Sequence, residues 1–313
     1  MSFAFVFPGQ GSQKVGMLAA FAAEDSAVRE TFEEASGVLG YDLWKLVQEG
    51  PDEQLNATEK TQPAMLAAGV ATLRLWRKRG GQEPAFVSGH SLGEFTALVC
   101  ADSLDFATAV DLVRFRGRVM QEAVPAGEGG MAAIVGLADE DVQAACTEAA
   151  QGQVVVPVNF NCPGQIVIAG QAAAVQRAIE VAKGRGAKVA KLLPLSVPSH
   201  CSLMEPASKR LGEKLAGIEV RAPKLKYISA VDSVAHGDPA DIRSLLVRQV
   251  VSPVRWTQTV RALVADGVDR IIECGPNKAL TGMNKRIEKR AGLEYLALED
   301  PASLTAALGG SFP

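Results

Sequence analysis

The sequence predicts an α/β protein whose mostly parallel sheet is interrupted by a small ferredoxin-like domain of βαββαβ order. Short apolar runs alternate with helical patterns along most of the chain, which is typical of a parallel sheet covered on both faces. Between residues 127 and 195 the order changes to strand, helix, two strands, helix and strand. The length of 313 residues is about twice that of a typical domain, as expected for a core with an insertion.

Glycine and proline bound the strands predicted in the first part of the core. Phe3–Phe7 is an apolar run that ends at Pro8 and Gly9, and residues 85–89 form a second apolar run. Ser103 is the expected N-cap of the last helix in this part. The predicted helices cover residues 15–39, 62–79, 92–100 and 106–123.

A glycine-rich break at residues 127–130 opens the predicted insertion. Its expected strands are 131–136, 154–160, 165–169 and 188–192, and its helices are 139–150 and 172–183. The core then resumes with strands 226–230, 270–273 and 295–298 and helices 203–216, 242–249, 258–265 and 279–290. We therefore expect a core of residues 1–126 and 196–313 and an insertion of residues 127–195.

Composition excludes several classes of partner. The chain has 32 basic and 35 acidic residues, a net charge of −3, and only 5% aromatic residues. It therefore lacks the basic field that binds nucleic acid or an anionic membrane surface, and it lacks stacking platforms for bases. No apolar stretch approaches the roughly 20 residues that span a bilayer.

The cysteines and the N-terminus indicate a cytoplasmic protein. Five cysteines are scattered along the chain without the spacing of a zinc site or a disulfide framework, so we expect no metal. The first residues lack the basic region and the long apolar run of a signal peptide. Nothing in the sequence requires more than a monomer.

The segment Gly89-His90-Ser91-Leu92-Gly93 fits the G-x-S-x-G pattern of a nucleophile elbow. It follows a predicted strand and opens a predicted helix, which is the setting that such an elbow requires. The alternative is a glycine-rich turn in which the serine only caps the helix. The strand and the helix on either side favour Ser91 as a nucleophile.

A serine nucleophile needs a base, and the chain has only three histidines. His200 lies in a proline-bounded loop before a helix and is the predicted general base. His90 directly precedes Ser91 and is expected in the pocket wall, whereas His236 lies in a polar loop. The oxyanion donors are expected from the backbone N–H groups of Leu92 and Gln10, with the loop after residue 274 as a weaker alternative.

Seven sequence blocks, in order, resemble those of the malonyl-CoA:acyl carrier protein transacylases of fatty acid synthesis and, more distantly, the acyltransferase domains of polyketide synthases. The blocks occupy residues 7–13, 61–64, 89–94, 116–117, 159–165, 198–201 and 273–276. The resemblance implies an α/β-hydrolase-like core with a ferredoxin-like insertion. It also implies that Ser91 is acylated and that His200 is its base.

The same resemblance assigns further site residues. Arg116 would pair with the free carboxylate of the malonyl group, and Gln62, His90 and Asn161 would line the substrate pocket. The backbone carbonyl of Gln249 would orient the histidine in place of a carboxylate, although the segment after it departs from the family pattern.

The helical pattern around Arg116 supports this role on physical grounds. Arg116 falls among apolar residues, whereas Arg114 and Arg118 share another face. A buried guanidinium needs an anion, and a substrate carboxylate can supply one. The alternative is a structural salt bridge to Glu94 or Asp111.

The predicted reaction is ping-pong transfer of a malonyl group from malonyl-CoA, through a malonyl-Ser91 ester, to the phosphopantetheine thiol of an acyl carrier protein, with no bound cofactor. Two basic clusters are candidates to dock an acidic carrier protein. One comprises Lys285, Arg286, Lys289 and Arg290 on one predicted helix, and the other comprises Lys183, Arg185, Lys188 and Lys191 at the edge of the small domain.

Two other functions use the same features. A serine esterase or thioesterase would need the same elbow, and a docking subunit would need no chemistry. The sequence leaves open the choice between fatty acid and polyketide synthesis, the strictness for malonyl groups and the oligomeric state.

Overall fold

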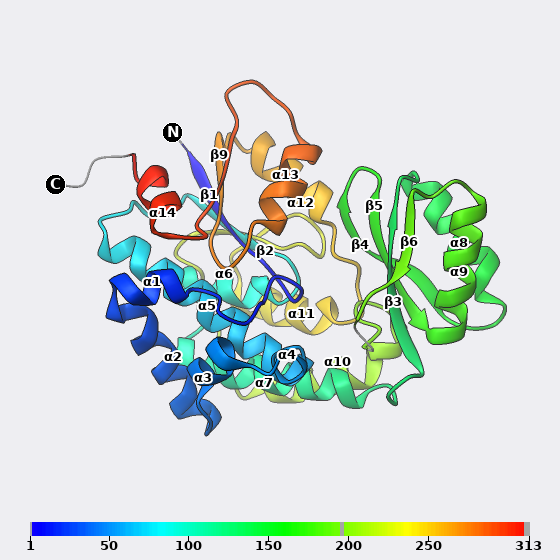
Figure 1. Cartoon of the computed structure of the whole chain (residues 1–313), viewed down its shortest axis with the longest axis horizontal. Coiled ribbons are helices and arrows are strands. Elements are labelled where there is room, and N and C mark those ends of the chain that lie inside the picture. The colour runs from blue at the N-terminus through cyan, green and yellow to red at the C-terminus, as the bar shows by residue number, and fades with distance from the viewer. Residues whose placement is uncertain (1, 195–196, 310–313) are drawn as a thin grey trace.

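The computed structural model describes residues 2–194 and 197–309 and contains two separate sheets (Figure 1). Sheet A has the order β10-β9-β1-β2-β7-β8, and only β8 runs antiparallel to its neighbour. Its strands are β1 (Phe3–Phe7), β2 (Phe86–Gly89), β7 (Lys226–Ile228), β8 (Ala235–His236), β9 (Arg270–Glu273) and β10 (Glu294–Ala297). The mostly parallel α/β core is therefore confirmed; β8 was not predicted.

The centre of sheet A brings two glycine loops together. β1 is an apolar strand, and its residues Ala4 to Phe7 are fully buried. It pairs in parallel with β2, so that Phe7 lies opposite Gly89 at the carboxyl ends of both strands. The loop after β1 and the turn after β2 therefore lie side by side, which is where ligands bind in open α/β sheets.

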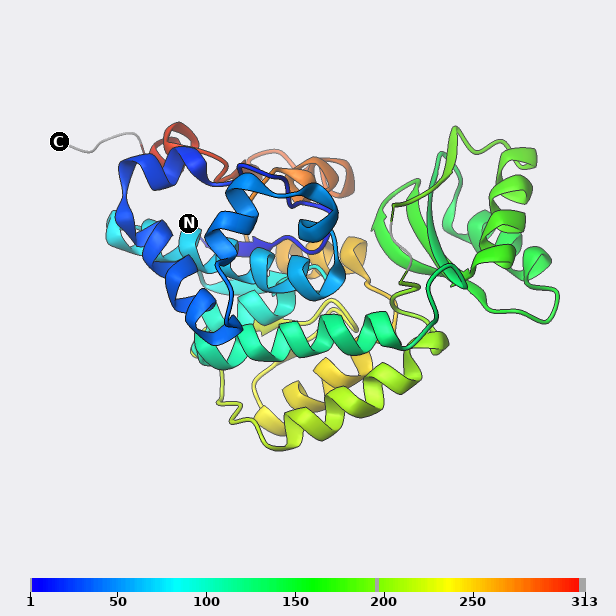
Figure 2. The same cartoon turned by 60° about the horizontal axis from the view of Figure 1, so that its bottom comes forward.

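Helices cover both faces of sheet A. In Figure 2 the long helices α7 and α10 lie beneath the core. The first group is α1 (Ala19–Glu24), α2 (Ser26–Leu39), α3 (Leu43–Glu49), α4 (Asp52–Leu55), α5 (Thr58–Lys78), α6 (Gly93–Cys100) and α7 (Phe106–Glu122). The second group is η1 (Ser202–Met204), α10 (Glu205–Ala216), α11 (Pro239–Gln249), α12 (Trp256–Ala265), α13 (Ala279–Ile287) and α14 (Pro301–Ala307).

Local capping explains where the predicted helices were wrong. The single helix expected at 15–39 is two helices, because Asp25 is extended and its carboxylate accepts a hydrogen bond from the N–H of Ala27. Asp105, not Ser103, caps α7, and the Ser103 hydroxyl instead donates to a loop carbonyl. α3 and α4 were not predicted.

The helix predicted at 279–290 ends at Ile287. Glu288 is extended, and its carbonyl accepts a hydrogen bond from the Tyr295 hydroxyl. Lys289 and Arg290 therefore lie beyond α13, and the first basic cluster does not lie on one helix.

Residues 129–192 form the antiparallel sheet B and its two helices, and the strand order of the sheet is β4-β5-β3-β6. The elements are β3 (Gly129–Val135), α8 (Asp139–Ala150), β4 (Val155–Cys162), β5 (Gln165–Gln171), α9 (Ala172–Gly184) and β6 (Val189–Leu192). This is the predicted βαββαβ order. Figures 1 and 2 show α8 and α9 on the side of sheet B that faces away from the core.

The inner face of sheet B packs on the core. Met131 and Val158 form one apolar cluster with Cys201, which follows His200 in sequence. The N–H of Phe160 donates to the carbonyl of Val254 at 2.9 Å, and the N–H of Val254 donates to the carbonyl of Val158 at 2.8 Å. These contacts place sheet B against the carboxyl end of sheet A.

The proposed division of the chain agrees with the membership of the two sheets but stays a prediction. Its second boundary, between residues 195 and 196, falls outside the described residues. Within the described parts, no helix is both long and apolar enough to cross a membrane.

Candidate active site

Ser91 occupies a sharp turn between β2 and α6. Its φ is 52°, in the left-handed region, which is uncommon for non-glycine residues. A side chain at Gly89 would come within 1.9 Å of the carbonyl carbon of Gly93, and one at Gly93 within 2.0 Å of the carbonyl oxygen of Phe7. The two glycines therefore allow the turn to close tightly against β1.

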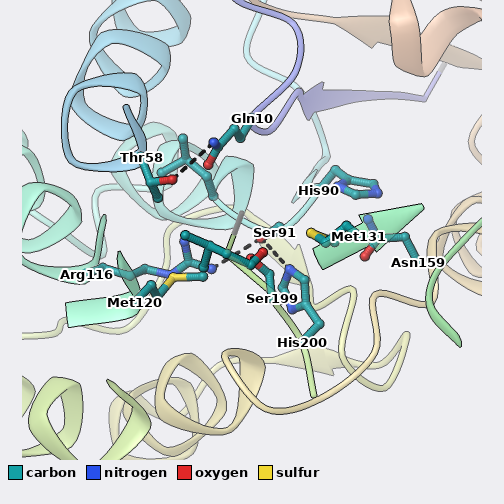
Figure 3. Close-up of a pocket in the computed structure, with 12 residues that line it drawn as sticks. Gln10, Thr58, His90, Ser91, Arg116, Met120, Met131, Asn159, Ser199 and His200 are labelled. Carbon is teal, nitrogen blue, oxygen red and sulfur yellow. Dashed lines mark hydrogen bonds between the residues drawn. The ribbon is translucent and has the colours of Figure 1, made fainter. Parts of the chain in front are cut away.

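Ser91 and His200 are in direct contact (Figure 3). The Ser91 Oγ lies 2.8 Å from the His200 Nε2. On the other side of the ring, Nδ1 lies 2.9 Å from the carbonyl oxygen of Gln249 and 3.1 Å from that of Ser252. Carbonyls only accept hydrogen bonds, so Nδ1 carries the proton and Nε2 is free to accept from the serine hydroxyl.

The environment keeps His200 neutral. Burial, together with the nearby positive charge of Arg116, lowers the pKa of His200 to about 3. The imidazole can therefore act as a base throughout the neutral range. No carboxylate contacts the ring among residues 2–194 and 197–309, and its Nδ1 contacts only backbone carbonyls there.

Arg116 projects from α7 into the site and is 1% exposed. Its Nη1 donates to the Gln62 Oε1 at 2.9 Å, and its Nη2 donates to the Gln249 Oε1 at 2.9 Å and to the Ser91 Oγ at 3.2 Å. The buried Nε has no acceptor in the described part of the chain. Burial lowers the pKa of Arg116 to about 10, so the side chain still carries its charge at neutral pH.

The predicted alternative of a salt bridge to Arg116 is wrong. Asp111 instead pairs with Arg114 at 2.7 Å and with Lys214. Glu94 accepts hydrogen bonds from the hydroxyls of Tyr227 and Ser229, and burial raises its pKa. The guanidinium thus lies beside Ser91, and its hydrogen-bond acceptors among the described residues are all neutral.

The two expected oxyanion donors lie in the same pocket. Gln10 and Leu92 both line it, from the loop after β1 and from the start of α6. Neither backbone N–H donates to an acceptor among the described residues. The Gln10 side chain donates to the Thr58 hydroxyl at 3.3 Å, which anchors its loop (Figure 3). The alternative loop at Gly275 packs on Pro8 and lines neither of the two cavities described below.

His90 forms the wall of the pocket. Its Nε2 lies 2.9 Å from the Asn161 Oδ1, its ring lies against Trp256, and burial lowers its pKa. His236 lies apart, in β8, where its Nε2 is 3.2 Å from Asp232. Of the three histidines, only His200 contacts the serine.

Two adjoining cavities meet at the site. The inner one, of about 60 Å³, contains Ser91, His200 and Arg116. The outer one, of about 420 Å³, lies between the loop after β1, sheet B and α13. The residues that line both are Gln10, His90, Met131 and Asn159.

Sequence reasoning missed three contributions to this site. The insertion supplies Met131 and Asn159 to both cavities, and Met120 lines the inner cavity. The Gln249 side chain also bridges the site, because its Nε2 donates to the carbonyl of Ser91 at 3.0 Å while its Oε1 accepts from Arg116. A sequence block pointed to position 159, whereas the two methionines carried no signal.

The described residues contain no group of three or more His, Cys, Asp or Glu side chains that could hold a metal ion. The groups that the structure brings together at the pocket are a serine, a neutral histidine, two backbone amides and a buried cation.

Comparison with known proteins identifies the class. The chain matches the model of the acyl transferase domain over residues 4–294, and it belongs to this family. It is 56% identical to the malonyl CoA-acyl carrier protein transacylase of Salmonella typhimurium, with 98% of each chain covered. It is 42% identical to that of Bacillus subtilis, over 97% of this chain and 96% of the relative.

Solved structures agree with this. The malonyl CoA-acyl carrier protein transacylase from Coxiella burnetii matches with a TM-score of 0.96 and 49% identity, covering 99% of this chain and 98% of its own. A malonyl-transacylase solved in complex with a type II PKS acyl-carrier protein matches with a TM-score of 0.97 and 52% identity, covering 99% of this chain and 100% of its own. The family resemblance read from the sequence is confirmed.

The lowered pKa of His200 predicts a flat pH dependence for the reaction of Ser91. A histidine with the ordinary pKa of about 6.5 would lose roughly 90% of its neutral form between pH of about 7.5 and 5.5. His200 stays neutral over this range because its pKa lies near 3. The rate of Ser91 labelling by an uncharged fluorophosphonate, followed by mass spectrometry, should therefore fall less than about twofold.

The His200→Ala variant is the control for this measurement and should label very slowly at every pH. A roughly tenfold fall in the wild-type rate over the same interval would contradict the lowered pKa.

Proposed function

We propose that this protein transfers a malonyl group from malonyl-CoA to the phosphopantetheine thiol of an acyl carrier protein, in fatty acid or polyketide synthesis. The observation that carries the proposal is a buried guanidinium that contacts no carboxylate in the described part of the chain and lies 3.2 Å from a serine that contacts a neutral histidine. This pairs a nucleophile with a receptor for an anionic acyl group. The names of the relatives support the same reaction.

In the first half-reaction, Ser91 attacks the thioester carbonyl of malonyl-CoA. His200 accepts the hydroxyl proton at Nε2 as the Oγ–C bond forms, and the carbonyls of Gln249 and Ser252 stabilise the resulting imidazolium. The free N–H groups of Gln10 and Leu92 are the proposed donors to the tetrahedral oxyanion. The C–S bond then breaks, and the proton on His200 passes to the CoA thiolate.

In the second half-reaction, the carrier thiol replaces CoA. His200 accepts the thiol proton, the sulfur attacks the malonyl-Ser91 ester, and the Ser91 oxygen leaves with the proton returned by His200. The same base and the same oxyanion donors therefore serve both steps, as ping-pong transfer between two thiols requires.

Arg116 would hold the free carboxylate of the malonyl group. One carboxylate oxygen can accept from Nε–H, which has no partner among the described residues, and the other can replace Ser91 as an acceptor from Nη2–H. Together these contacts form a bidentate ion pair on one edge of the guanidinium. Gln62 and Gln249 hold the guanidinium in place from its other hydrogen atoms. His90 and Asn161 would complete the pocket wall.

The esterase or thioesterase alternative is not favoured. A triad esterase orients its histidine with a carboxylate, whereas His200 contacts two backbone carbonyls. A buried cation beside the nucleophile also cannot form an ion pair with an uncharged acyl group. The comparisons likewise match transacylases over nearly the whole chain.

The docking surface for the carrier protein is proposed on the core side of the outer cavity. Ala279, Leu280 and Met283 of α13 line that cavity, and Lys285 follows on the same helix. Among the described residues, Lys285 and Lys289 form no ion pair, and neither do Lys188 and Lys191 of the second cluster. Lys183 and Arg185 of the second cluster are paired with Glu180 and Glu148. The position of α13 at the outer cavity is therefore what favours the first cluster.

The proposal also includes a monomeric, cytoplasmic enzyme without a bound cofactor. All five cysteines are free and buried, which is consistent with a reducing compartment. The site's own side chains and amides supply every proton transfer and charge that the reaction needs.

Incubation with radiolabelled malonyl-CoA tests the reaction directly. Label should appear on the protein, map to the peptide containing Ser91 and move to added phosphopantetheinyl carrier protein faster than it is released as free malonate. Ser91→Ala should carry no label. Unlabelled wild-type protein would contradict the covalent mechanism, and release mainly to water would support the thioesterase.

Replacement of Arg116 tests the carboxylate site. Arg116→Ala should lower kcat/KM for malonyl transfer by roughly 100-fold or more, because it removes charge-assisted hydrogen bonds that only a carboxylated acyl group can use. Transfer of acetyl groups should suffer much less. Arg118→Ala, on the exposed face of the same helix, is the matched control. Equal losses for both donors would count against the role of Arg116.

Charge reversal tests the docking surface. The double variant Lys285→Glu/Lys289→Glu should raise the KM for carrier protein by about tenfold at low salt and leave the KM for malonyl-CoA nearly unchanged. The matched control is Lys183→Glu/Arg185→Glu in the second cluster. A carrier KM that is insensitive to salt and to both double variants would count against electrostatic docking through these four residues.

A further inference from the structure

Asn159 lies at the junction of the two cavities and has an unused acceptor. It lines the inner cavity with Ser91 and also the outer cavity with α13. Its Oδ1 is buried and has no hydrogen-bond partner in the described residues. Buried polar atoms without partners are rare in native proteins, and each one invites a functional explanation. Figure 3 shows this side chain beside Met131 and His90, on the sheet B side of the pocket.

The local backbone fixes the position of Asn159. The pairing of β4 with β5 shifts register between Pro157 and Asn159, which marks a β-bulge. Bulges commonly redirect a side chain next to an active site. Asn159 also forms a parallel bridge with Val254, and the adjacent hydrogen bonds of Phe160 and Val158 to Val254 join the insertion to the core. The backbone that carries this carboxamide is therefore fixed by hydrogen bonds both to β5 in the insertion and to Val254 in the core.

The other asparagine of this segment, Asn161, already has a partner within the protein. The Asn161 Oδ1 is already in contact with the His90 Nε2 at 2.9 Å, so it fixes a wall residue. The Asn159 oxygen has no such partner in residues 2–194 and 197–309. Of the two carboxamides that the insertion brings to this region, Asn159 is the one left to accept from a ligand.

The chemistry of the substrates indicates which ligand group would use this acceptor. On the proposed function, malonyl-CoA and the carrier protein present the same arm, in which two methylene groups join the sulfur to an amide. With the sulfur at Ser91 in the inner cavity and the rest of the arm in the outer cavity, that amide falls where the cavities meet. Its N–H is the donor nearest to the reacting sulfur.

We propose that the Asn159 Oδ1 accepts a hydrogen bond from the thioester arm's amide N–H nearest to the sulfur. The contact would serve both half-reactions, because the arm is common to the acyl donor and the acyl acceptor. It would also give a partner to an oxygen at the junction that has none among the described residues. This hydrogen bond would fix how far the arm enters the pocket, whereas Arg116 would bind the carboxylate of the acyl group.

A pair of small substrates isolates this hydrogen bond. The malonyl thioester of N-acetylcysteamine contains the amide, and that of 5-mercaptopentan-2-one replaces only the N–H by a methylene group. Wild-type protein should acylate Ser91 from the first with a kcat/KM about tenfold higher, since the second leaves the buried oxygen unpaired. In Asn159→Ala the ratio between the two substrates should fall to about one.

Two variants distinguish recognition from a structural effect. Asn159→Asp keeps an acceptor oxygen and should retain the preference for the amide. Asn56→Ala, at the outer cavity, where the Asn56 Oδ1 accepts from Gln13, should keep the wild-type ratio. The ratio compares two substrates on the same protein, so a loss of folded protein cancels from it.

The outcomes separate the two proposals. If wild-type protein transfers malonyl groups but treats the two thioesters alike, or if Asn159→Ala keeps the tenfold preference, the assignment of Asn159 is overturned. If wild-type protein transfers no malonyl group from malonyl-CoA, the proposed function itself fails.

Discussion

Arg116 lies inside the protein with its charge facing two carboxamide oxygens and a serine hydroxyl. A buried cation without an anionic partner is costly in a low-dielectric interior, and its own pKa is lowered accordingly. The rest of the site is arranged around that charge. It lowers the pKa of the neighbouring His200, and it requires acceptors from helices α5 and α11. A substrate that brings a carboxylate would compensate the charge and gain binding energy that an uncharged acyl group could not.

Gln249 shows how closely the parts of the site are coupled. Its carbonyl accepts from the His200 ring, its Oε1 accepts from Arg116, and its Nε2 donates to the carbonyl of Ser91. One residue thus contacts Ser91, His200 and Arg116. Because these contacts share a single backbone position at the end of α11, a shift in that helix would move all three groups together.

Sheet A and the insertion position the remaining residues of the pocket from opposite sides. The parallel pairing of β1 with β2 brings the loop of Gln10 next to the turn of Ser91, so that two backbone N–H groups can face one pocket. The insertion closes the opposite side with Met131 and Asn159, and backbone hydrogen bonds to Val254 hold it there. The site therefore lies where sheet A, sheet B and the histidine loop meet, and the strands of sheet A come from both ends of the chain.

The sequence by itself determined the elements with strong local signals. The apolar strand before the Gly-x-Ser-x-Gly turn located Ser91, the βαββαβ rhythm located the insertion, and seven blocks identified the family. Local patterns failed where a cap or a distant contact decides the outcome, as at Asp25, at Asp105 and at the end of α13. Only the tertiary structure decided that Gln249 contacts Ser91, His200 and Arg116 through its side chain and its backbone carbonyl. It also decided that, among the described residues, Arg116 contacts no carboxylate and the Asn159 Oδ1 has no hydrogen-bond partner. These facts depend on contacts between residues that are far apart in sequence. Periodicity predicts which face of a helix or strand a residue lies on, but not which distant residue it contacts.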